Sequence, residues 1–165
     1  MISGGGPETK QCPHSVKRQS SRIIVKLLLY DEEQLAIEDA IDTVLKRLDT
    51  TYLDTLILAL PSKGKELTRD RIRRVWSLAE QAIRYRVKDL GMSDLDTDQL
   101  IDLHSFANIK PTSNQVNMEL CCSIPEEMNE FAHEHNIKLL THGDPVGRFQ
   151  MPGSRIYFGR PNFQF

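Results

Sequence analysis

Short apolar runs alternate with helical periodicities along most of the chain. Ile23 to Tyr30 and Asp54 to Leu60 are nearly continuous apolar runs, and runs of that length are typical of strands buried on both faces. Between them, Glu33 to Leu48 carries apolar residues three and four positions apart, the spacing of an amphipathic helix. The pattern therefore predicts a strand, a helix and a second strand in succession.

The alternation continues beyond the second strand. Thr68 can cap a helix whose apolar side chains recur at helical spacing as far as Ile83. Arg86 to Met92 predicts a third strand, and either Ser93 or Asp96 can begin the helix that follows it. This part of the chain therefore adds another strand between two helices.

A complete strand, helix and strand unit is predicted near the C-terminal end of the pattern. Thr112 to Val116 and Ile137 to Leu140 are its two short strands. The helix between them has Ser123 as its expected N-cap and Pro125 in its first turn, where a missing N–H costs nothing. Five strands alternating with four helices result, which indicates an α/β fold with parallel strands joined by right-handed crossovers.

Polar side chains gather directly after the last two predicted strands. They lie in Asn114 to Asn117 and in Thr141 to Asp144. Functional sites of α/β proteins lie at the C-terminal ends of parallel strands. We therefore expect the functional site at that edge of the sheet.

The two ends of the chain lack the periodicity of its middle. Residues 1–21 contain glycines and prolines without an apolar pattern, which predicts a disordered N-terminal arm. Residues 148–165 combine glycine and proline with five aromatic residues and predict an irregular C-terminal tail. Residues 22–147 are expected to form the single domain.

Composition narrows the class of protein. With 165 residues, 39% of them hydrophobic, and a net charge of -2, the chain can bury one core and offers no strongly basic surface for nucleic acid or membranes. No segment approaches the roughly 20 apolar residues of a membrane span, and residues 1–21 contain no signal peptide. Three cysteines make no disulfide framework and no zinc-type spacing accompanies them. We expect a cytoplasmic protein without a metal site.

Several polar residues have both a structural and a functional interpretation. His133 and His135 lie two apart on a helix, so they point in different directions and are expected to face solvent. His142 follows a strand and could be functional, but no carboxylate is predicted beside it. Six arginines crowd the helix after Thr68, either as its solvated face, paired with Glu66, Asp70 and Glu80, or as a protein-binding patch. These arginines are Arg69, Arg71, Arg73, Arg74, Arg84 and Arg86.

Five stretches resemble successive strand ends of the aldo-keto reductase superfamily, whose members are (β/α)8 barrels: VKLLL, YLDTLILALP, LGMSDLD, KPTSNQVN and IKLLTHGDP. Within it they resemble the family of glutamate–cysteine ligase regulatory (modifier) subunits, on SDLD, SNQVN, the pair Cys121 and Cys122, and LLTHGDP. The resemblance implies a partial TIM barrel over residues 22–147. A whole barrel needs about 250 residues, so the chain corresponds to strands three to seven of a shortened barrel, with open sheet edges and marginal stability.

The resemblance also bears on catalysis. Aldo-keto reductases reduce carbonyls with NADPH, using a tyrosine, a lysine, an aspartate and a histidine. Lys26 falls where the lysine belongs, but Ala59 takes the position of the histidine, and nothing before Ile23 resembles the other two. The resemblance therefore implies a vestigial Lys26 and no catalytic site. The NADPH-dependent aldo-keto reductase remains the alternative.

Cofactor binding is a separate question. Ser113 and Asn114 match the pair that hydrogen-bonds the nicotinamide carboxamide in the enzymes, which leaves a weak vestigial NADP site open. The other interpretation is that Asn114 and Gln115 satisfy backbone groups at the strand end. We expect no resident cofactor.

Cys121 and Cys122 precede a predicted helix, whose N-terminus favours the reactive thiolate. The resemblance implies that this pair lies near the contact with the ligase catalytic subunit and can form a mixed disulfide with it. The structural alternative is two small thiols that fill a loop. The resemblance thus implies a non-catalytic regulatory subunit of glutathione biosynthesis, which forms a heterodimer with the catalytic subunit of glutamate–cysteine ligase.

Overall fold

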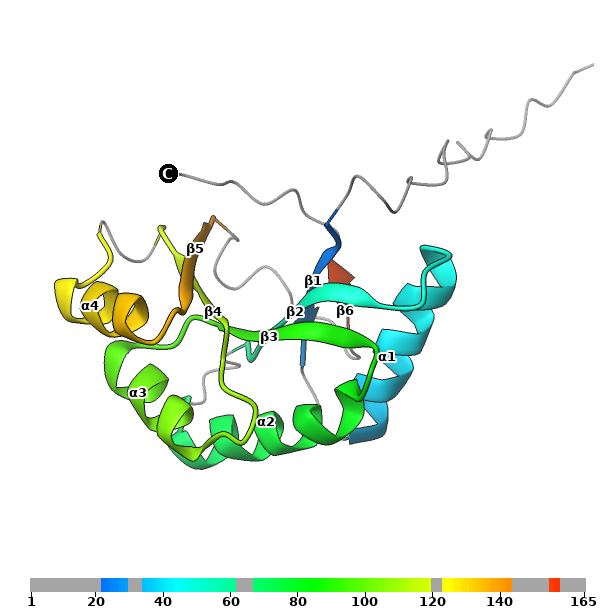
Figure 1. Ribbon diagram of the computed structural model, residues 1–165, viewed down its shortest axis with the longest axis horizontal. Helices are drawn as coiled ribbons and strands as arrows, with labels where there is room; N and C mark the ends of the chain where they lie inside the picture. Colours follow the sequence, from blue (N-terminus) through cyan, green and yellow to red (C-terminus); the bar gives the residue numbers. More distant parts are fainter. Residues whose placement is uncertain (1–21, 30–33, 62–66, 120–122, 144–154, 158–165) are drawn as a thin grey trace, which may run out of the picture.

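A curled sheet with helices along one side is the central feature of the protein (Figure 1). The computed structural model describes residues 22–29, 34–61, 67–119, 123–143 and 155–157. Within these ranges the chain forms six strands and four helices. No helix among them is long and apolar enough to cross a membrane.

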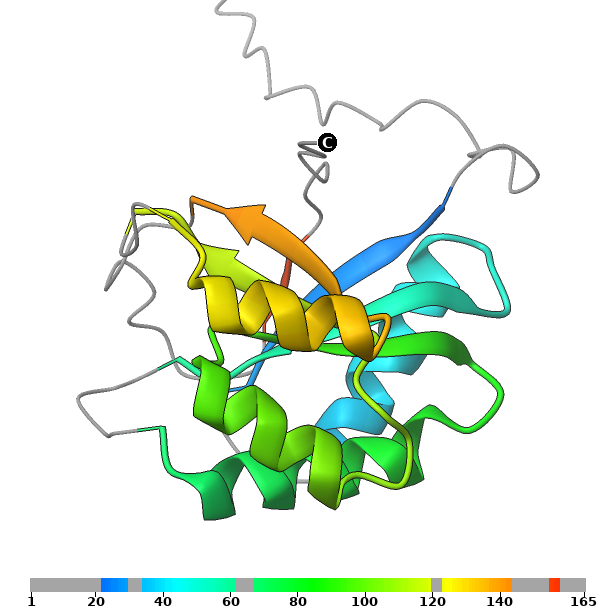
Figure 2. The same cartoon turned by 60° about the vertical axis from the view of Figure 1, so that its left-hand side comes forward.

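Five strands run parallel, as the sequence predicts. The sheet order is β5-β4-β3-β2-β1-β6, and only β6 is antiparallel to its neighbour, β1. Seen from the side, the strands fan around a curve rather than lie flat, which is the geometry of a partial (β/α)8 barrel (Figure 2). The strands are β1 (Ile24–Leu28), β2 (Leu53–Ala59), β3 (Val87–Ser93), β4 (Ser113–Asn117), β5 (Lys138–His142) and β6 (Arg155–Tyr157).

The short strand β6 falls within residues 148–165, which the sequence predicts as an irregular tail, and the rest of that segment lies outside the described residues. Residues 155–157 pair with β1, so that Tyr157 lies opposite Lys26 and Arg155 opposite Leu28. Three residues are too few to show an alternating pattern in the sequence. Their strand conformation instead follows from the backbone groups that β1 offers on the side away from β2.

The four predicted helices are present. They are α1 (Gln34–Arg47), α2 (Arg69–Ile83), α3 (Thr97–Phe106) and α4 (Glu126–Glu134). Thr68 caps α2 by accepting a hydrogen bond from the backbone of Arg71 at 3.4 Å. Asp96, rather than Ser93, caps α3, and it forms a capping box with Gln99.

Ser123 does not cap α4, which contradicts the sequence prediction. The N-cap position belongs to Pro125, and no side chain hydrogen-bonds to the first turn. Because the helix starts at Glu126, Ser123 lies upstream of the position from which a hydroxyl reaches the free N–H groups. The proline, whose φ is -57°, decides where the helix begins.

The hydrophobic core lies between the sheet and the helices. Alternate residues of β1 and β2, such as Leu27 and Leu58, pack with Trp76 of α2 and are almost fully buried. The intervening residues face the other way, and Leu28 with Ala59 forms a small separate cluster there. Since Lys26 alternates with Leu27 in the same way, its side chain projects from the concave face of the sheet.

Candidate functional site at the strand ends

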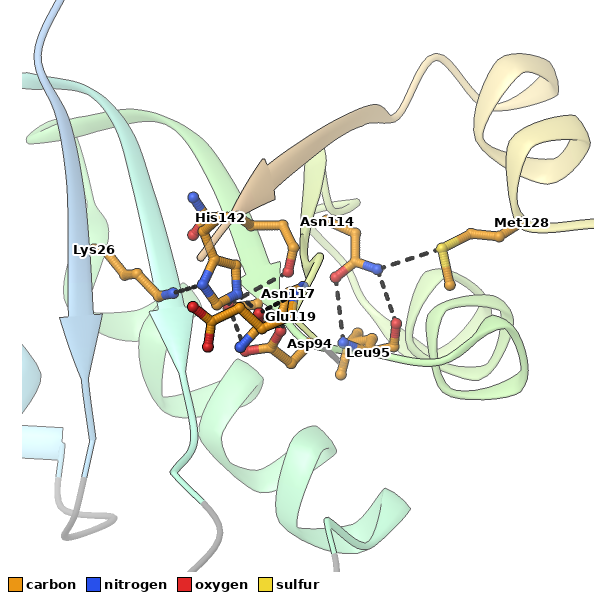
Figure 3. Close-up of polar contacts among 10 residues, drawn as sticks. Lys26, Asp94, Leu95, Asn114, Asn117, Glu119, Met128 and His142 are labelled. Atoms are coloured by element: carbon orange, nitrogen blue, oxygen red, sulfur yellow. Dashed lines mark hydrogen bonds and ion pairs between the residues drawn. The ribbon is translucent and has the colours of Figure 1, made fainter. Parts of the chain in front are cut away.

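Three charged or ionisable side chains meet at the C-terminal ends of the strands. Lys26 Nζ lies 3.4 Å from His142 Nδ1, and His142 Nε2 lies 2.9 Å from Asp94 Oδ1 (Figure 3). Lys26 comes from β1, His142 ends β5, and Asp94 directly follows β3. No carboxylate was expected beside His142 from the sequence, and the position of Asp94 corrects that expectation. The available signal was that both residues follow predicted strands.

The hydrogen-bond roles follow from the chemistry of the groups. A lysine ammonium has donors only, so His142 Nδ1 accepts from Lys26. The neutral imidazole then carries its proton on Nε2 and donates it to Asp94. In this hydrogen-bonded chain Lys26 is therefore the cation, His142 the neutral link and Asp94 the anion. If His142 carried a second proton, Nδ1 would itself be a donor and could no longer accept a hydrogen bond from the Lys26 ammonium.

Asp94 is held from several directions. Its carboxylate accepts from Ser93 Oγ at 2.9 Å and from the backbone N–H of Asn117 at 3.1 Å. Its own N–H donates to the carbonyl of Gln115 at 2.7 Å. Its φ of 65° lies in the left-handed region, which aspartate tolerates better than most residues. The carboxylate is thus fixed between β3, β4 and β5.

Charge at this cluster is balanced locally. The side chain of His142 is 8% exposed, whereas that of Asp94 is 42% exposed. Burial raises the pKa of Asp94, but hydrogen bonds from His142 and Ser93, with the charge of Lys26, hold that pKa below its usual range. The carboxyl is therefore ionised at neutral pH.

The arrangement is not a serine, histidine and aspartate triad. Ser93 Oγ lies 3.4 Å from His142 Nε2, the same nitrogen that bonds to Asp94. A triad needs the hydroxyl and the carboxylate on opposite ring nitrogens. Since Lys26 occupies Nδ1, the cluster does not activate Ser93 as a nucleophile. The cluster instead joins the middle of β1 to the C-terminal ends of β3 and β5.

Lys26 and Ala59 occupy the positions that the resemblance assigns to the catalytic lysine and histidine. Lys26 contacts His142 at the rim of the curled sheet. Ala59 ends β2, is 5% exposed and packs against Leu28. A methyl group at that position cannot orient a carbonyl substrate.

The residues assigned to the nicotinamide do not converge on one ligand. Asn114 is 0% exposed, and its amide donates to the carbonyl of Leu95 at 3.0 Å and accepts from the Leu95 N–H at 3.4 Å. It also lies 3.8 Å from Met128 Sδ, on the helix side of the sheet. Ser113 alternates with it on β4. The Asn114 side chain is therefore engaged by both backbone groups of Leu95.

Ser113 occupies a tight position between β3 and β4. Among the described residues its buried Oγ finds no hydrogen-bond partner, and neither does Oε1 of Gln115. A Cβ at Gly91 would lie 2.1 Å from Ser113 Oγ and 2.8 Å from its carbonyl oxygen. Glycine at position 91 therefore lets the two strands approach with Ser113 between them.

The remaining sequence candidates lie elsewhere. Cys121 and Cys122 fall outside the described residues. His133 is exposed, as predicted. His135 is half-buried, and its ring lies 4.3 Å from the rings of His104 and Phe131. No group of three or more metal-binding side chains occurs within the described ranges.

The chain is similar in sequence to proteins of one known family. The sequence profile of the aldo/keto reductase family matches residues 9–148. The glutamate–cysteine ligase regulatory subunit of Homo sapiens is 31% identical over 151 residues, which cover 84% of this chain and 55% of the relative. An NADPH-dependent alpha-keto amide reductase of Saccharomyces cerevisiae is 27% identical over 68% of this chain and 36% of its own.

Among solved structures, an aldo/keto reductase from Brucella melitensis superposes with a TM-score of 0.60 at 25% identity, covering 83% of this chain and 52% of its own. The chain thus spans about half the length of the curated regulatory subunits that it matches, 55% in the human case. These likenesses agree with the partial barrel seen in the sheet.

Proposed function

The chain belongs to the aldo/keto reductase family, and from that premise we propose that it is a non-catalytic regulatory subunit that binds the catalytic subunit of glutamate–cysteine ligase. The observation that carries the proposal is the 31% identity, over 84% of this chain, to a protein named as the regulatory subunit of that ligase. A putative regulatory subunit of Schizosaccharomyces pombe gives similar support at 27% identity over 78% of the chain.

The geometry of the strand ends supports a role without catalysis. Carbonyl reduction needs a proton donor tuned by the lysine and a group that orients the substrate. Here the Lys26 ammonium contacts His142, and Ala59 offers only a methyl group. We also propose that the chain acts without a resident nicotinamide cofactor, because Asn114 already bonds both backbone groups of Leu95.

Regulation in this proposal is a shift of the catalytic subunit toward its active state, which requires only that the chain bind that state more tightly. The expected effects are better use of glutamate and weaker inhibition by glutathione. Mixing the purified chain with the catalytic subunit tests this, with co-elution and the KM for glutamate as readouts. An equimolar aldo-keto reductase enzyme is the control, since it shares the fold. No co-elution and an unchanged KM reject the proposal.

A contact through Cys121 and Cys122 forms part of the proposal. Ser123, the first described residue after the pair, is exposed. The expected result is a mixed disulfide with the catalytic subunit under mild oxidation, detected by mass spectrometry and lost in the double variant Cys121→Ser, Cys122→Ser. An unchanged cross-link in that variant contradicts it. We propose the cytoplasm as the compartment, where such a bond is reversible.

An NADPH-dependent reductase is the second candidate, and one observation favours it. The β1–β6 pairing sets Tyr157 opposite Lys26, and family enzymes pair these two residue types for proton transfer. Carbonyl reduction that is lost in both Tyr157→Phe and Lys26→Met would support this candidate. We expect no such activity in the unmodified chain.

A further inference from the structure

An aromatic cluster that contains two histidines lies between α3 and α4. The rings of His104, in the last turn of α3, and His135, at the C-cap of α4, have their centroids 4.3 Å apart and their planes inclined by 40°. The ring of Phe131 lies 4.3 Å from that of His135 and meets the ring of His104 edge-on at 5.5 Å. We call these three side chains the histidine cluster. It joins the C-terminal ends of the two helices.

The packing of the cluster suits neutral imidazoles. All three side chains are half-buried. Neutral imidazole rings can stack like other aromatic rings, whereas two imidazolium rings in the same positions would bring like charges together. Even in water, two unit charges about 4 Å apart repel each other enough to change an equilibrium about fivefold. The cluster therefore accommodates one proton more readily than two.

A lysine already binds the end of α3 on which His104 lies. Lys110 Nζ donates to the carbonyl oxygen of His104 at 2.7 Å and to that of Ala107 at 2.8 Å. The C-terminus of a helix attracts positive charge, and here the ammonium of Lys110 supplies it. A protonated His104 would therefore share this helix end with another cation.

The pKa of His104 reflects these neighbours. Partial burial lowers the pKa of His104 below its ordinary value. The charge of His135, when that ring is protonated, and the charge of Lys110 lower it further. Both charges that act on His104 in this way are positive.

The acidic side chains around the cluster are bound elsewhere or face solvent. Asp102 of α3 accepts two hydrogen bonds from Arg73, at 2.9 and 2.6 Å, and Glu80 of α2 accepts from the backbone N–H of Ile109 at 2.7 Å. The remaining charged groups of α3, α4 and the start of β5 are exposed: Asp98, Glu126, Glu127, Glu130, His133, Glu134 and Lys138. Water and salt screen exposed charges, so a second proton within the cluster gains little compensation from them.

Helix α4 is the element that repulsion within the cluster would loosen. It has nine residues and no side-chain hydrogen bond at its N-cap, and helices of that length depend on tertiary contacts. Met128 and Ala132, which are 3% and 2% exposed, hold its middle to the core. The rings of Phe131 and His135 contact α3 near its C-terminal end. The histidine cluster therefore determines how firmly the last turn of α4 is held.

We propose that the histidine cluster is a pH-dependent contact between α3 and α4, which holds while the two imidazoles carry at most one proton and separates when both are protonated. The protons come from solvent and return to it. Separation frees the last turn of α4 and the turn at Asn136, whose φ is 56°, that leads into β5. The inference concerns the fold alone and is independent of the proposed function.

Histidine titration followed by NMR tests the coupling between the two rings. In the unmodified chain the pKa of His104 should lie below the ordinary value for histidine, and its resonances should shift a second time as His135 titrates. The pKa of His104 should rise in His135→Gln, which keeps a polar side chain but takes up no proton. His133→Gln is the matched control, because it removes an exposed histidine of the same helix, and it should leave the pKa of His104 unchanged.

Equal values of that pKa in the two variants would overturn the proposal. If His135→Gln does not fold, the unmodified chain still decides the question, since a single titration step of His104 at the ordinary value means that the rings are not coupled.

Hydrogen exchange tests the separation of the helices. The backbone N–H groups of His135 and Ile137 bond to the carbonyls of Phe131 and Ala132 and report on the last turn of α4. From about pH 7.5 to about pH 5.5, the range in which histidine titrates, their opening should increase about fivefold after correction for the intrinsic exchange rate. The same increase in His104→Gln, or no increase in the unmodified chain, would overturn the proposal.

The sign of the pH effect follows from the direction of the pKa shift. The unfolded chain binds the proton more readily, because an unperturbed histidine has a pKa of about 6.5. The stability associated with neutral His104 is therefore present above that pH and is lost as the pH falls through the lower folded pKa. Thermal melts over the same range should show a decrease in Tm that is smaller in His104→Gln.

Discussion

Lys26 Nζ and His142 Nδ1 lie 3.4 Å apart although three strands separate β1 from β5 in the sheet. Neighbouring strands are spaced about 4.8 Å apart, so a flat sheet would keep these side chains far from each other. Their contact exists because the sheet curls toward closure. The Lys26–His142 contact therefore links β1 to β5 across the concave face of the curled sheet.

Replacing His142 with alanine should destabilise the protein by about 1–3 kcal/mol, because Lys26 and Asp94 lose the imidazole that joins them. Urea unfolding measures the change. His133→Ala is the matched control, since His133 is exposed on α4, and it should alter stability by no more than about 0.5 kcal/mol. Equal effects of the two variants would show that the contacts of His142 with Lys26 and Asp94 contribute nothing to stability.

The contribution of Asp94 should depend on pH. Burial raises its pKa, but the His142 hydrogen bond and neighbouring charges hold it below the usual value. A carboxyl of this kind stabilises the fold above its unfolded pKa, about 3.9, and loses that contribution as the pH falls through the lower folded pKa. The difference in the free energy of unfolding between the unmodified protein and Asp94→Asn should be largest near neutral pH and should decrease below about pH 4. Asp98→Asn, an exposed change on α3, should change the stability only slightly.

Gly91→Ala should cost about 1–3 kcal/mol. Its Cβ would lie 2.8 Å from the Ser113 carbonyl oxygen, which belongs to the backbone and cannot rotate away. Gly143→Ala is the control, because the nearest atom there, Glu119 Oε1, lies 3.9 Å away. Thermal melts of the two variants should differ clearly. A neutral Gly91→Ala would mean that β3 and β4 separate without penalty.

Asn114→Ala should destabilise the protein by about 2–4 kcal/mol, because it leaves two buried backbone groups of Leu95 unsatisfied. Asn129→Ala, on the exposed face of α4, should be nearly neutral. Denaturant unfolding gives both values. The same geometry predicts that NADPH leaves the Tm of the unmodified chain unchanged. A rise in Tm with NADPH that disappears in Asn114→Ala would contradict the structural role given to this side chain.

Local signals were sufficient for most of the fold. Helix α2 could be located from its apolar spacing and from Thr68, because these signals lie within a few residues of each other. Helix α3 was predicted to begin at either Ser93 or Asp96, and the structure selects Asp96. The alternation of strands and helices then implied parallel strands. The start of α4 differs from the prediction, which has Ser123 as the N-cap and Pro125 in the first turn, because only the backbone geometry places Pro125 at the N-cap.

The sequence by itself determined the order and type of the elements, since hydrophobic periodicity and capping act over short distances along the chain. Only the tertiary structure decided which polar groups meet. His142 contacts Asp94, 48 residues away in the sequence, and Lys26, 116 residues away, and β6 is a strand only because β1 lies beside it. Such contacts depend on the curl of the sheet and on strand register, and both arise from packing that no local segment encodes.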